Sequence, residues 1–323
     1  MLELLSKIDK IKKVIDNKKV VILFPGQASQ YKSMGSIWYN SFSKYKQIFD
    51  YINQKVTSYY RDFIDEDLFS LIENEQKLNI TLYSQISIFT VSVCCYETLR
   101  EVFGDSQCCL AGHSLGEYSL LVCSGCISLD SGIDLVVKRG YYMHNYSKNG
   151  TMFAVIYSFD NSSIGLLESI LKSYNSVVAN YNSYSQLIVS CSVEVVDDLR
   201  ERIKKEFSGC KIIPLRVSGA FHSHLVDVAN QYLQKEIDKV SFSKPVVPIC
   251  LNSSFCYDPL EIKEIMKNQM VTPVNWIKTI ETIYNSFSEV VFIEVLPNKV
   301  LTNLSRKGFP SNIADISYSV EEL

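Results

Sequence analysis

The sequence predicts an α/β protein with a parallel-sheet body and a smaller inserted subdomain. Short apolar runs alternate with segments of helical spacing, which is typical of parallel strands joined by crossover helices. From residue 150 the order of elements changes to β-α-β-β-α-β, the order of a ferredoxin-like unit, before the alternating pattern returns. We therefore expect a body of residues 1–149 and 218–323 around an inserted ferredoxin-like subdomain of residues 150–217.

The first predicted element is an amphipathic helix over residues 1–18, which carries apolar residues along one face. Those residues are Leu4, Ile8, Ile11 and Ile15. Apolar runs that stop at turn residues predict the buried strands of the body. These strands are Val20–Phe24, Cys108–Ala111, one near Pro248–Asn252, and Val290–Val295.

Helical spacing predicts the remaining helices of the body. They cover residues 36–54, 82–102, 115–124, 129–147, 224–239 and 274–287, and a final helix starts at Lys299. The subdomain is predicted to have the strands Met152–Tyr157, Val177–Asn180, Gln186–Ser190 and Lys211–Val217, and the helices Asn161–Tyr174 and Val193–Phe207.

Charge and composition exclude several classes of protein. Lys plus Arg number 32 against 35 Asp plus Glu, a net charge of −3, so a nucleic-acid-binding surface is not expected. The chain has no run of about 18 uncharged apolar residues and no N-terminal secretory signal, so we expect neither a membrane span nor a disulfide framework. The ten cysteines are expected to be free, and Cys123-Ser124-Gly125-Cys126 lacks the second pair that a zinc site needs. We expect a monomer.

One motif combines a strand, a tight turn and a helix. Gly112-His113-Ser114-Leu115-Gly116 follows the apolar strand at Cys108–Ala111 and precedes a helical pattern. This context is typical of the nucleophile elbow of hydrolase-like α/β proteins, in which glycines permit a strained turn that raises the serine hydroxyl to the carboxyl edge of the sheet. Ser114 is therefore the candidate nucleophile, and the turn points the Leu115 N–H toward a developing oxyanion.

A serine nucleophile needs a base, and the chain has four histidines. His113 lies on the strained turn and is expected to form a wall of the pocket, whereas His144, at a polar helix end, is expected to be exposed or a cap. His222 and His224 follow a predicted strand in a loop of small residues, where the catalytic side chains of open α/β sheets collect. The residues alone leave the choice between these two open. No acid stands out between Ser114 and His222, which counts against a generic serine hydrolase.

Five segments, taken in order, resemble the malonyl-CoA:acyl carrier protein transacylases. The segments are Phe24–Gln30, Gly112–Glu117, Gly219–Ser223, Gln269–Trp276 and Glu294–Leu301, and together they span nearly the whole chain. The resemblance implies that Ser114 is the acylated nucleophile and His222 its base. In this family a main-chain carbonyl orients the histidine in place of a carboxylate, and the matching position is Gln269, which removes the objection of the missing acid.

The resemblance also implies roles for the residues around the nucleophile. The backbone N–H groups of Gln27 and Leu115 would form the oxyanion hole. Arg139 matches the arginine that holds the malonyl carboxylate. Gln85 matches a glutamine of the same pocket, although a capped helix start explains Gln85 equally well. Phe221 is expected to crowd the C2 position of the acyl group.

The implied reaction is transfer of malonyl from malonyl-CoA to the phosphopantetheine thiol of an acyl carrier protein through a malonyl-serine ester, without a metal or redox cofactor. Arg306 and Lys307 match a basic pair at the edge of the active-site gorge and would contact the acidic carrier protein, but a helix C-terminus also favours cations. A trans-acting polyketide acyltransferase, a serine thioesterase or hydrolase, and a silent carrier-binding subunit are the alternatives. The expected compartment is the cytoplasm for a bacterial protein, and a plastid or mitochondrion for a trimmed eukaryotic one.

Three positions depart from the family pattern. Ala28 stands where the family usually has glycine, and Leu296 and Asn298 flank Pro297 where the family has two glycines. Asn298 can adopt a left-handed conformation, whereas Leu296 cannot do so cheaply. We therefore expect local changes in the geometry of these two loops.

Overall fold

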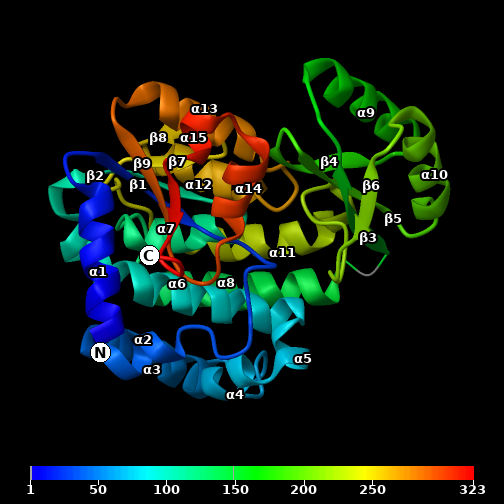
Figure 1. Cartoon of the computed structure of the whole chain (residues 1–323). Helices are drawn as coiled ribbons and strands as arrows, with labels where there is room; N and C mark the ends of the chain where they lie inside the picture. The colour runs from blue at the N-terminus through cyan, green and yellow to red at the C-terminus, as the bar shows by residue number, and fades with distance from the viewer. Residues whose placement is uncertain (1, 148) are drawn as a thin grey trace.

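The computed structural model describes residues 2–147 and 149–323, except for the side chains of residues 2–5 and 105. It contains one sheet of six strands and one of four. The smaller sheet and its two helices, α9 and α10, form the green lobe at the upper right of Figure 1. The larger sheet and all other helices form the rest of the molecule.

The larger sheet has the strand order β10-β9-β1-β2-β7-β8. Its strands are β1 (Lys19–Phe24), β2 (Gln107–Gly112), β7 (Ile249–Leu251), β8 (Ser254–Cys256), β9 (Val290–Glu294) and β10 (Ser317–Ser319). Neighbouring strands are parallel except β8, which is antiparallel to β7. The predicted parallel-sheet body is therefore confirmed.

Helices cover both faces of this sheet. Those on one side include α6, α7, α8 and α11, and those on the other include α13, α14 and α15 (Figure 1). Their bounds, with those of the other body helices, are α1 (Leu2–Ile15), α2 (Ser36–Ser41), α3 (Ser43–Tyr59), α4 (Leu68–Glu73), α5 (Glu75–Leu78), α6 (Thr81–Phe103), η1 (Gly104–Ser106), α7 (Gly116–Cys123), α8 (Leu129–Asn145), η2 (His224–Val226), α11 (Asp227–Asp238), α12 (Pro259–Asn268), α13 (Trp276–Ser286), α14 (Val300–Gly308) and α15 (Ser311–Ala314).

The continuous apolar run of β1 follows from burial on both faces. Successive side chains of a strand point to opposite faces. Val20, Ile22 and Phe24 therefore join the core beneath α6 and α8, whereas Val21 and Leu23 join the core beneath α13. A strand covered on both sides needs apolar residues at every position, and β1 has them from Val20 to Phe24.

The smaller sheet has the order β4-β5-β3-β6, and each of its strands is antiparallel to its neighbours. Its elements are β3 (Gly150–Ile156), α9 (Asn161–Ser173), β4 (Val177–Ser183), β5 (Gln186–Ser192), α10 (Val196–Glu206) and β6 (Lys211–Pro214). This is the strand order of a ferredoxin-like unit, and the unit has an apolar core of its own. The predicted fold class is confirmed, while the exact limits of body and subdomain stay a prediction.

Two elements that the sequence analysis left out have clear local causes. The antiparallel strand β8 follows Asn252 and Ser253, whose φ angles of 38° and 75° form the two-residue turn of a hairpin. Helix α12 starts after Asp258, whose carboxylate accepts the N–H groups of Leu260 and Glu261, and Pro259 occupies the first helical position. The expected helix over 36–54 is divided in two at Phe42, whose backbone is extended.

All ten cysteines are free thiols in the part of the chain that the structure describes. Ile11 and Ile15 of α1 are buried against the body, and the side chain of Leu4 lies outside the described residues. No helix in the described part of the chain is long and apolar enough to cross a membrane.

Candidate active site

The turn between β2 and α7 places Ser114 at the carboxyl edge of the larger sheet. Ser114 has a φ of 52°, in the left-handed region that residues with a side chain rarely adopt. A Cβ on Gly112 would lie 2.3 Å from the carbonyl carbon of Gly116, and a Cβ on Gly116 would lie 2.1 Å from the carbonyl oxygen of Phe24. Only glycine fits at either position, which explains the G-x-S-x-G spacing of the motif.

The structure brings His222 onto Ser114. Ser114 Oγ lies 2.7 Å from His222 Nε2, and His222 Nδ1 lies 3.2 Å from the carbonyl oxygen of Gln269 and 2.9 Å from that of Thr272. Two carbonyl acceptors fix the proton on Nδ1, so Nε2 is left to accept the serine proton. Thr272 was not among the predicted residues, and it supplies the shorter of the two contacts.

His222 is buried, and this sets its protonation state. Burial, followed by the nearby charge of Arg139, lowers the pKa of the imidazole to about 3. The carbonyls of Thr272 and Gln269 oppose this shift because they favour the protonated ring. The ring is therefore neutral at physiological pH, as a general base must be.

The other two candidate histidines lie away from the serine hydroxyl. His224 is exposed, and its Nε2 lies 3.2 Å from Asn175 Nδ2 in the subdomain. His144 is half-buried in the last turn of α8. The residues alone left the choice between His222 and His224 open. In the structure His222 is the one in contact with Ser114.

Arg139 enters the site from α8 as a buried cation. Its Nη1 donates to Gln85 Oε1 at 2.7 Å, and its Nη2 lies 3.3 Å from both Ser114 Oγ and Gln269 Oε1. The guanidinium is 5.3 Å above the Tyr118 ring and forms no ion pair with a carboxylate among the described residues. A buried guanidinium held by neutral amides beside the nucleophile is a ready binding group for an anion.

Gln85 and Gln27 extend this network. Gln85 is fully buried on α6 and its Nε2 lies 3.4 Å from Gln27 Oε1. Within residues 2–147 and 149–323, the backbone N–H groups of Gln27 and Leu115 have no acceptor of their own, so both can donate to an oxyanion.

A cavity of about 300 Å³ opens in front of Ser114. Its walls come from both lobes: Gln27, Ala28, Gln30, Asn79, His113, Ser114, Met143, Met152, Asn180, Leu215, Arg216, Val217, Phe221 and His222. His113 lines the cavity, as the sequence analysis expected, and its Nε2 lies 2.8 Å from Asn182 Oδ1 on β4. This contact ties the elbow to the subdomain, and sequence reasoning missed Asn182 because it is remote in the chain.

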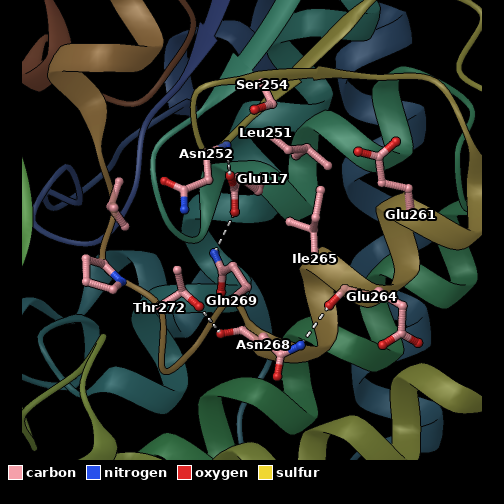
Figure 2. A pocket seen from close by; sticks show the side chains of 12 residues that line it. Glu117, Leu251, Asn252, Ser254, Glu261, Glu264, Ile265, Asn268, Gln269 and Thr272 are labelled. Carbon is pink, nitrogen blue, oxygen red and sulfur yellow. Dashed lines mark hydrogen bonds between the residues drawn. The ribbon is translucent and has the colours of Figure 1, made fainter.

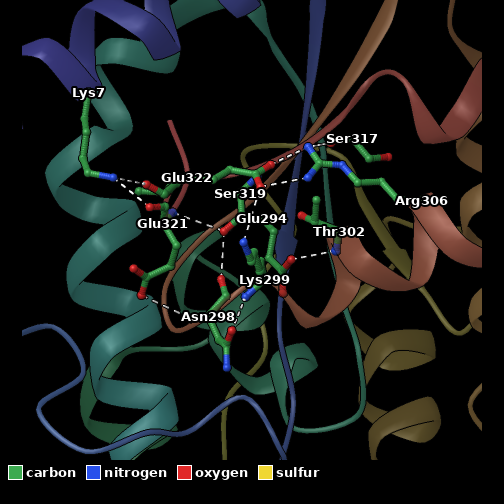
Figure 3. Close-up of polar contacts among 11 residues, drawn as sticks. Lys7, Glu294, Asn298, Lys299, Thr302, Arg306, Ser317, Ser319, Glu321 and Glu322 are labelled. Carbon is green, nitrogen blue, oxygen red and sulfur yellow. Dashed lines mark hydrogen bonds and ion pairs between the residues drawn. The ribbon is translucent and has the colours of Figure 1, made fainter.

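Arg306 and Lys307 do not line this cavity. Both are exposed on α14, and Figure 3 shows Arg306 directed toward the end of the chain. Arg306 forms an ion pair with Glu322 and donates to the carbonyl of Ser317 at 3.0 Å. Arg306 therefore has a structural partner already, and contact with a carrier protein stays a prediction for this pair.

The three departures from the family pattern have different outcomes. Ala28 has a φ of 76° and Asn298 a φ of 65°, so both adopt the left-handed backbone that glycine would adopt. Leu296, by contrast, does not have a positive φ. It is buried, and its carbonyl oxygen accepts a hydrogen bond from the hydroxyl of Ser92 at 2.7 Å. Steric strain is therefore expected at Ala28 and not at Leu296.

Known acyltransferases are similar to this chain over nearly its whole length. The acyl transferase domain family matches residues 21–320. The malonyl CoA-acyl carrier protein transacylase of Bacillus subtilis is 30% identical over 294 residues, which cover 90% of each chain. The solved structure of MCAT from Streptococcus pneumoniae is 30% identical with a TM-score of 0.80 and covers 94% of this chain and 100% of that one. A malonyl-transacylase solved in complex with its type II polyketide acyl carrier protein is 28% identical with a TM-score of 0.80 and covers 93% of this chain and 94% of that one.

Proposed function

Because the chain belongs to the family of malonyl-CoA:acyl carrier protein transacylases, we propose that it transfers malonyl from malonyl-CoA to the phosphopantetheine thiol of an acyl carrier protein, for fatty acid biosynthesis. One observation carries this proposal: Ser114 Oγ lies 2.7 Å from His222 Nε2 and 3.3 Å from Arg139 Nη2. A nucleophile, a neutral base and a cation thus meet at one point. The cation is placed for the free carboxylate that distinguishes malonyl from acetyl.

In the first half-reaction Ser114 Oγ attacks the thioester carbonyl of malonyl-CoA while His222 Nε2 accepts the hydroxyl proton. The oxyanion that forms accepts hydrogen bonds from the backbone N–H groups of Leu115 and Gln27. The carbon–sulfur bond then breaks, and His222 gives its proton to the departing thiolate of coenzyme A. The product is a malonyl ester on Ser114.

In the second half-reaction the pantetheine thiol of the carrier protein occupies the place that coenzyme A left. His222 accepts the thiol proton, the sulfur attacks the ester carbonyl, and Ser114 leaves with the proton that His222 returns. Each step moves only a proton and an acyl group, so the scheme needs no metal or electron-carrying cofactor. Because the first product leaves before the second substrate reacts, the kinetics are ping-pong.

The side chains around the cavity set the acyl specificity. Arg139 binds the malonyl carboxylate, and Gln85 Oε1 accepts a hydrogen bond from Arg139 Nη1, the terminal nitrogen that does not face Ser114. Phe221 lines the cavity beside the base and crowds the C2 carbon of the acyl group. Methylmalonyl-CoA, which carries a methyl group at C2, is therefore a poor substrate, and comparable kcat/KM values for the two diacids would refute this role of Phe221.

Two alternatives differ from this proposal in the fate of the ester. Service to a polyketide pathway uses the same chemistry with another carrier protein, and one similar solved structure holds such a carrier. A serine hydrolase releases the acyl group to water with no thiol acceptor. No feature of the site favours either alternative over the proposed transacylase. Arg139 beside Ser114 favours an acyl donor with a second carboxylate.

Mass spectrometry of the protein after incubation with malonyl-CoA tests the proposal. The wild-type chain is expected to form a malonyl ester that persists in water and disappears when holo acyl carrier protein is added. Ser114→Ala is expected to remain folded and to form no adduct, because only the hydroxyl is lost. An adduct on Ser114→Ala at the wild-type rate would refute the nucleophile, and loss of the wild-type ester in water alone would favour the hydrolase.

A further inference from the structure

Glu117 is a buried acid that the proposed reaction does not use. It lies in the first turn of α7, three residues after the nucleophile, and only 4% of its surface is exposed. Its two carboxylate oxygens accept the backbone N–H of Asn252 at 3.1 Å and the Nε2 amide of Gln269 at 2.9 Å (Figure 2). Burial raises the pKa of Glu117 to about 7, and the hydrogen bonds from Gln269 and Asn252 oppose this rise.

The Gln269 side chain links Glu117 to the reaction site. Its Nε2 donates to Glu117 and also to the carbonyl oxygen of Ser114 at 2.7 Å. Both amide hydrogens are therefore in use, and Oε1 is left to face Arg139 Nη2 at 3.3 Å. If the amide turned over, its NH₂ group would face a guanidinium that can only donate, and the contact would become repulsive.

Packing alone does not fix this orientation. Glu117 and Gln269 both border a second cavity of about 450 Å³, whose other walls include Leu251 and Ile265. Figure 2 shows the two side chains meeting at this cavity, which has neither Ser114 nor His222 among its lining residues. Gln269 has open space on one side, so its hydrogen-bond partners select the amide orientation, and Glu117 is the charged acceptor among them.

Glu117 makes no direct hydrogen bond to Arg139: the Gln269 amide stands between them, although the two opposite charges also attract each other over the gap. The two form no direct ion pair, so the guanidinium keeps its charge available for an incoming anion while its direction is fixed. A carboxylate in direct contact would instead compete with the anion for the same donors. With the Gln269 amide between them, Glu117 can help to orient the Arg139 guanidinium without forming an ion pair that would occupy its donors.

We propose that Glu117 is a positioning residue for acyl selection: it fixes the Gln269 amide in the orientation that directs Arg139 toward the carboxylate of the acyl group. This inference rests on the proposed function, because it assigns Glu117 to the malonyl carboxylate that Arg139 binds. Glu117 touches no substrate in this role. We infer that its effect passes through the hydrogen bond that Arg139 Nη2 donates to Gln269 Oε1.

The test is Glu117→Gln, assayed at pH 8 where Glu117 is ionised. The glutamine keeps the shape of the side chain but has only one accepting group for two donors. We expect kcat/KM for malonyl-CoA to fall about 10-fold, mainly through KM, as for one misdirected charge-assisted hydrogen bond. The kcat/KM for acetyl-CoA, which has no carboxylate to misalign, is expected to stay within about 2-fold of the wild type.

Glu294→Gln is the matched control. Glu294 is also fully buried, its pKa is also raised by burial to about 7, and it also accepts two N–H groups, those of Leu301 and Thr302 (Figure 3). It borders neither cavity. This variant is expected to lower the melting temperature without changing the ratio of malonyl to acetyl activity. If Glu294→Gln changes the ratio as Glu117→Gln does, the effect is general destabilisation and the inference is wrong.

The double variant Glu117→Gln/Arg139→Ala separates positioning from other effects. If Glu117 acts through Arg139, its substitution changes the malonyl-to-acetyl ratio no further once the guanidinium is gone. A further fall in the ratio would overturn the inference. If Glu117→Gln does not fold, Gln269→Met, which breaks the link and leaves Glu117 in place, must shift the ratio in the same direction. Failure of the wild type to form a malonyl ester would refute the proposed function itself.

Discussion

Arg139→Ala removes the cation beside the nucleophile, and its effect on acyl specificity can be estimated from the site. The guanidinium is buried, so solvent does not screen it, and among the described residues its Nε has no hydrogen-bond partner. Nη2 already points at Ser114 Oγ from 3.3 Å. A carboxylate bound next to the nucleophile thus meets a charged donor that needs no rearrangement.

The expected magnitude follows from one such contact. A hydrogen bond to a charged group contributes about 1.5–3 kcal/mol, which is about 10- to 150-fold in kcat/KM. Only malonyl carries the carboxylate, so Arg139→Ala is expected to lower kcat/KM for malonyl-CoA by this factor and to preserve or raise the value for acetyl-CoA. Arg139→Met, which fills more of the same space, is expected to give the same specificity change with a smaller loss of stability.

The assay is acyl-enzyme formation in a single turnover, with each donor in turn and rapid acid quenching before mass spectrometry. The melting temperature of each variant is measured alongside. A parallel fall for malonyl-CoA and acetyl-CoA would show that Arg139 holds the structure together and does not read the carboxylate. An unchanged malonyl rate would refute the reasoning entirely.

Four further outcomes are expected. His222→Ala should slow acylation by a factor of about 10² to 10⁴, the contribution of a positioned base, and His224→Ala should not; the reverse result would exchange their roles. Because the pKa of His222 is lowered to about 3 in the folded chain, near pH 5 only the unfolded chain protonates this imidazole. Between pH 7 and pH 5 the free energy of urea unfolding should therefore fall by about 2 kcal/mol more in the wild type than in His222→Ala. Ala28→Gly should raise the free energy of urea unfolding by up to about 1 kcal/mol. A left-handed backbone costs alanine about 1–2 kcal/mol, and the greater conformational entropy of glycine in the unfolded chain offsets part of the relieved strain. An unchanged free energy of unfolding would mean that Ala28 is not strained. Charge reversal at Lys307 should raise KM for the carrier protein by up to about 5-fold at unchanged melting temperature. Charge reversal at Arg306 should also lower the melting temperature, because it breaks the ion pair with Glu322. Equal slowing of both half-reactions would mean that the carrier protein binds elsewhere.

Features encoded by local sequence were predictable. The elbow at Ser114 requires two glycines at fixed positions between an apolar strand and a helix, and each requirement is visible in the residue types. The ferredoxin-like unit was predictable for the same reason, because its strands and helices follow one another without interruption. The family resemblance, which spans the chain, supplied the partners that lie far apart in sequence.

Features that depend on tertiary contacts were not predictable. The carbonyl of Thr272 orients His222, but a main-chain carbonyl has no residue type that could mark it. Asn182 meets His113 only after the two lobes have folded together. The three-residue strand β10 owes its place to pairing with β9, since so short a segment has no periodicity of its own. By contrast, Asp258 and Pro259 did carry a helix-start signal that would have indicated α12.

The loop that orients His222 has an evolutionary consequence. In a serine triad with a carboxylate, a single nucleotide change can delete the side chain that holds the imidazole. Here the acceptors are the peptide carbonyls of Gln269 and Thr272, which every amino acid possesses. No codon substitution removes either oxygen, so selection acts on the path of the loop and its length. Insertions, deletions and new prolines between residues 269 and 274 are therefore the changes that purifying selection should eliminate, whereas other substitutions of Thr272 keep the carbonyl.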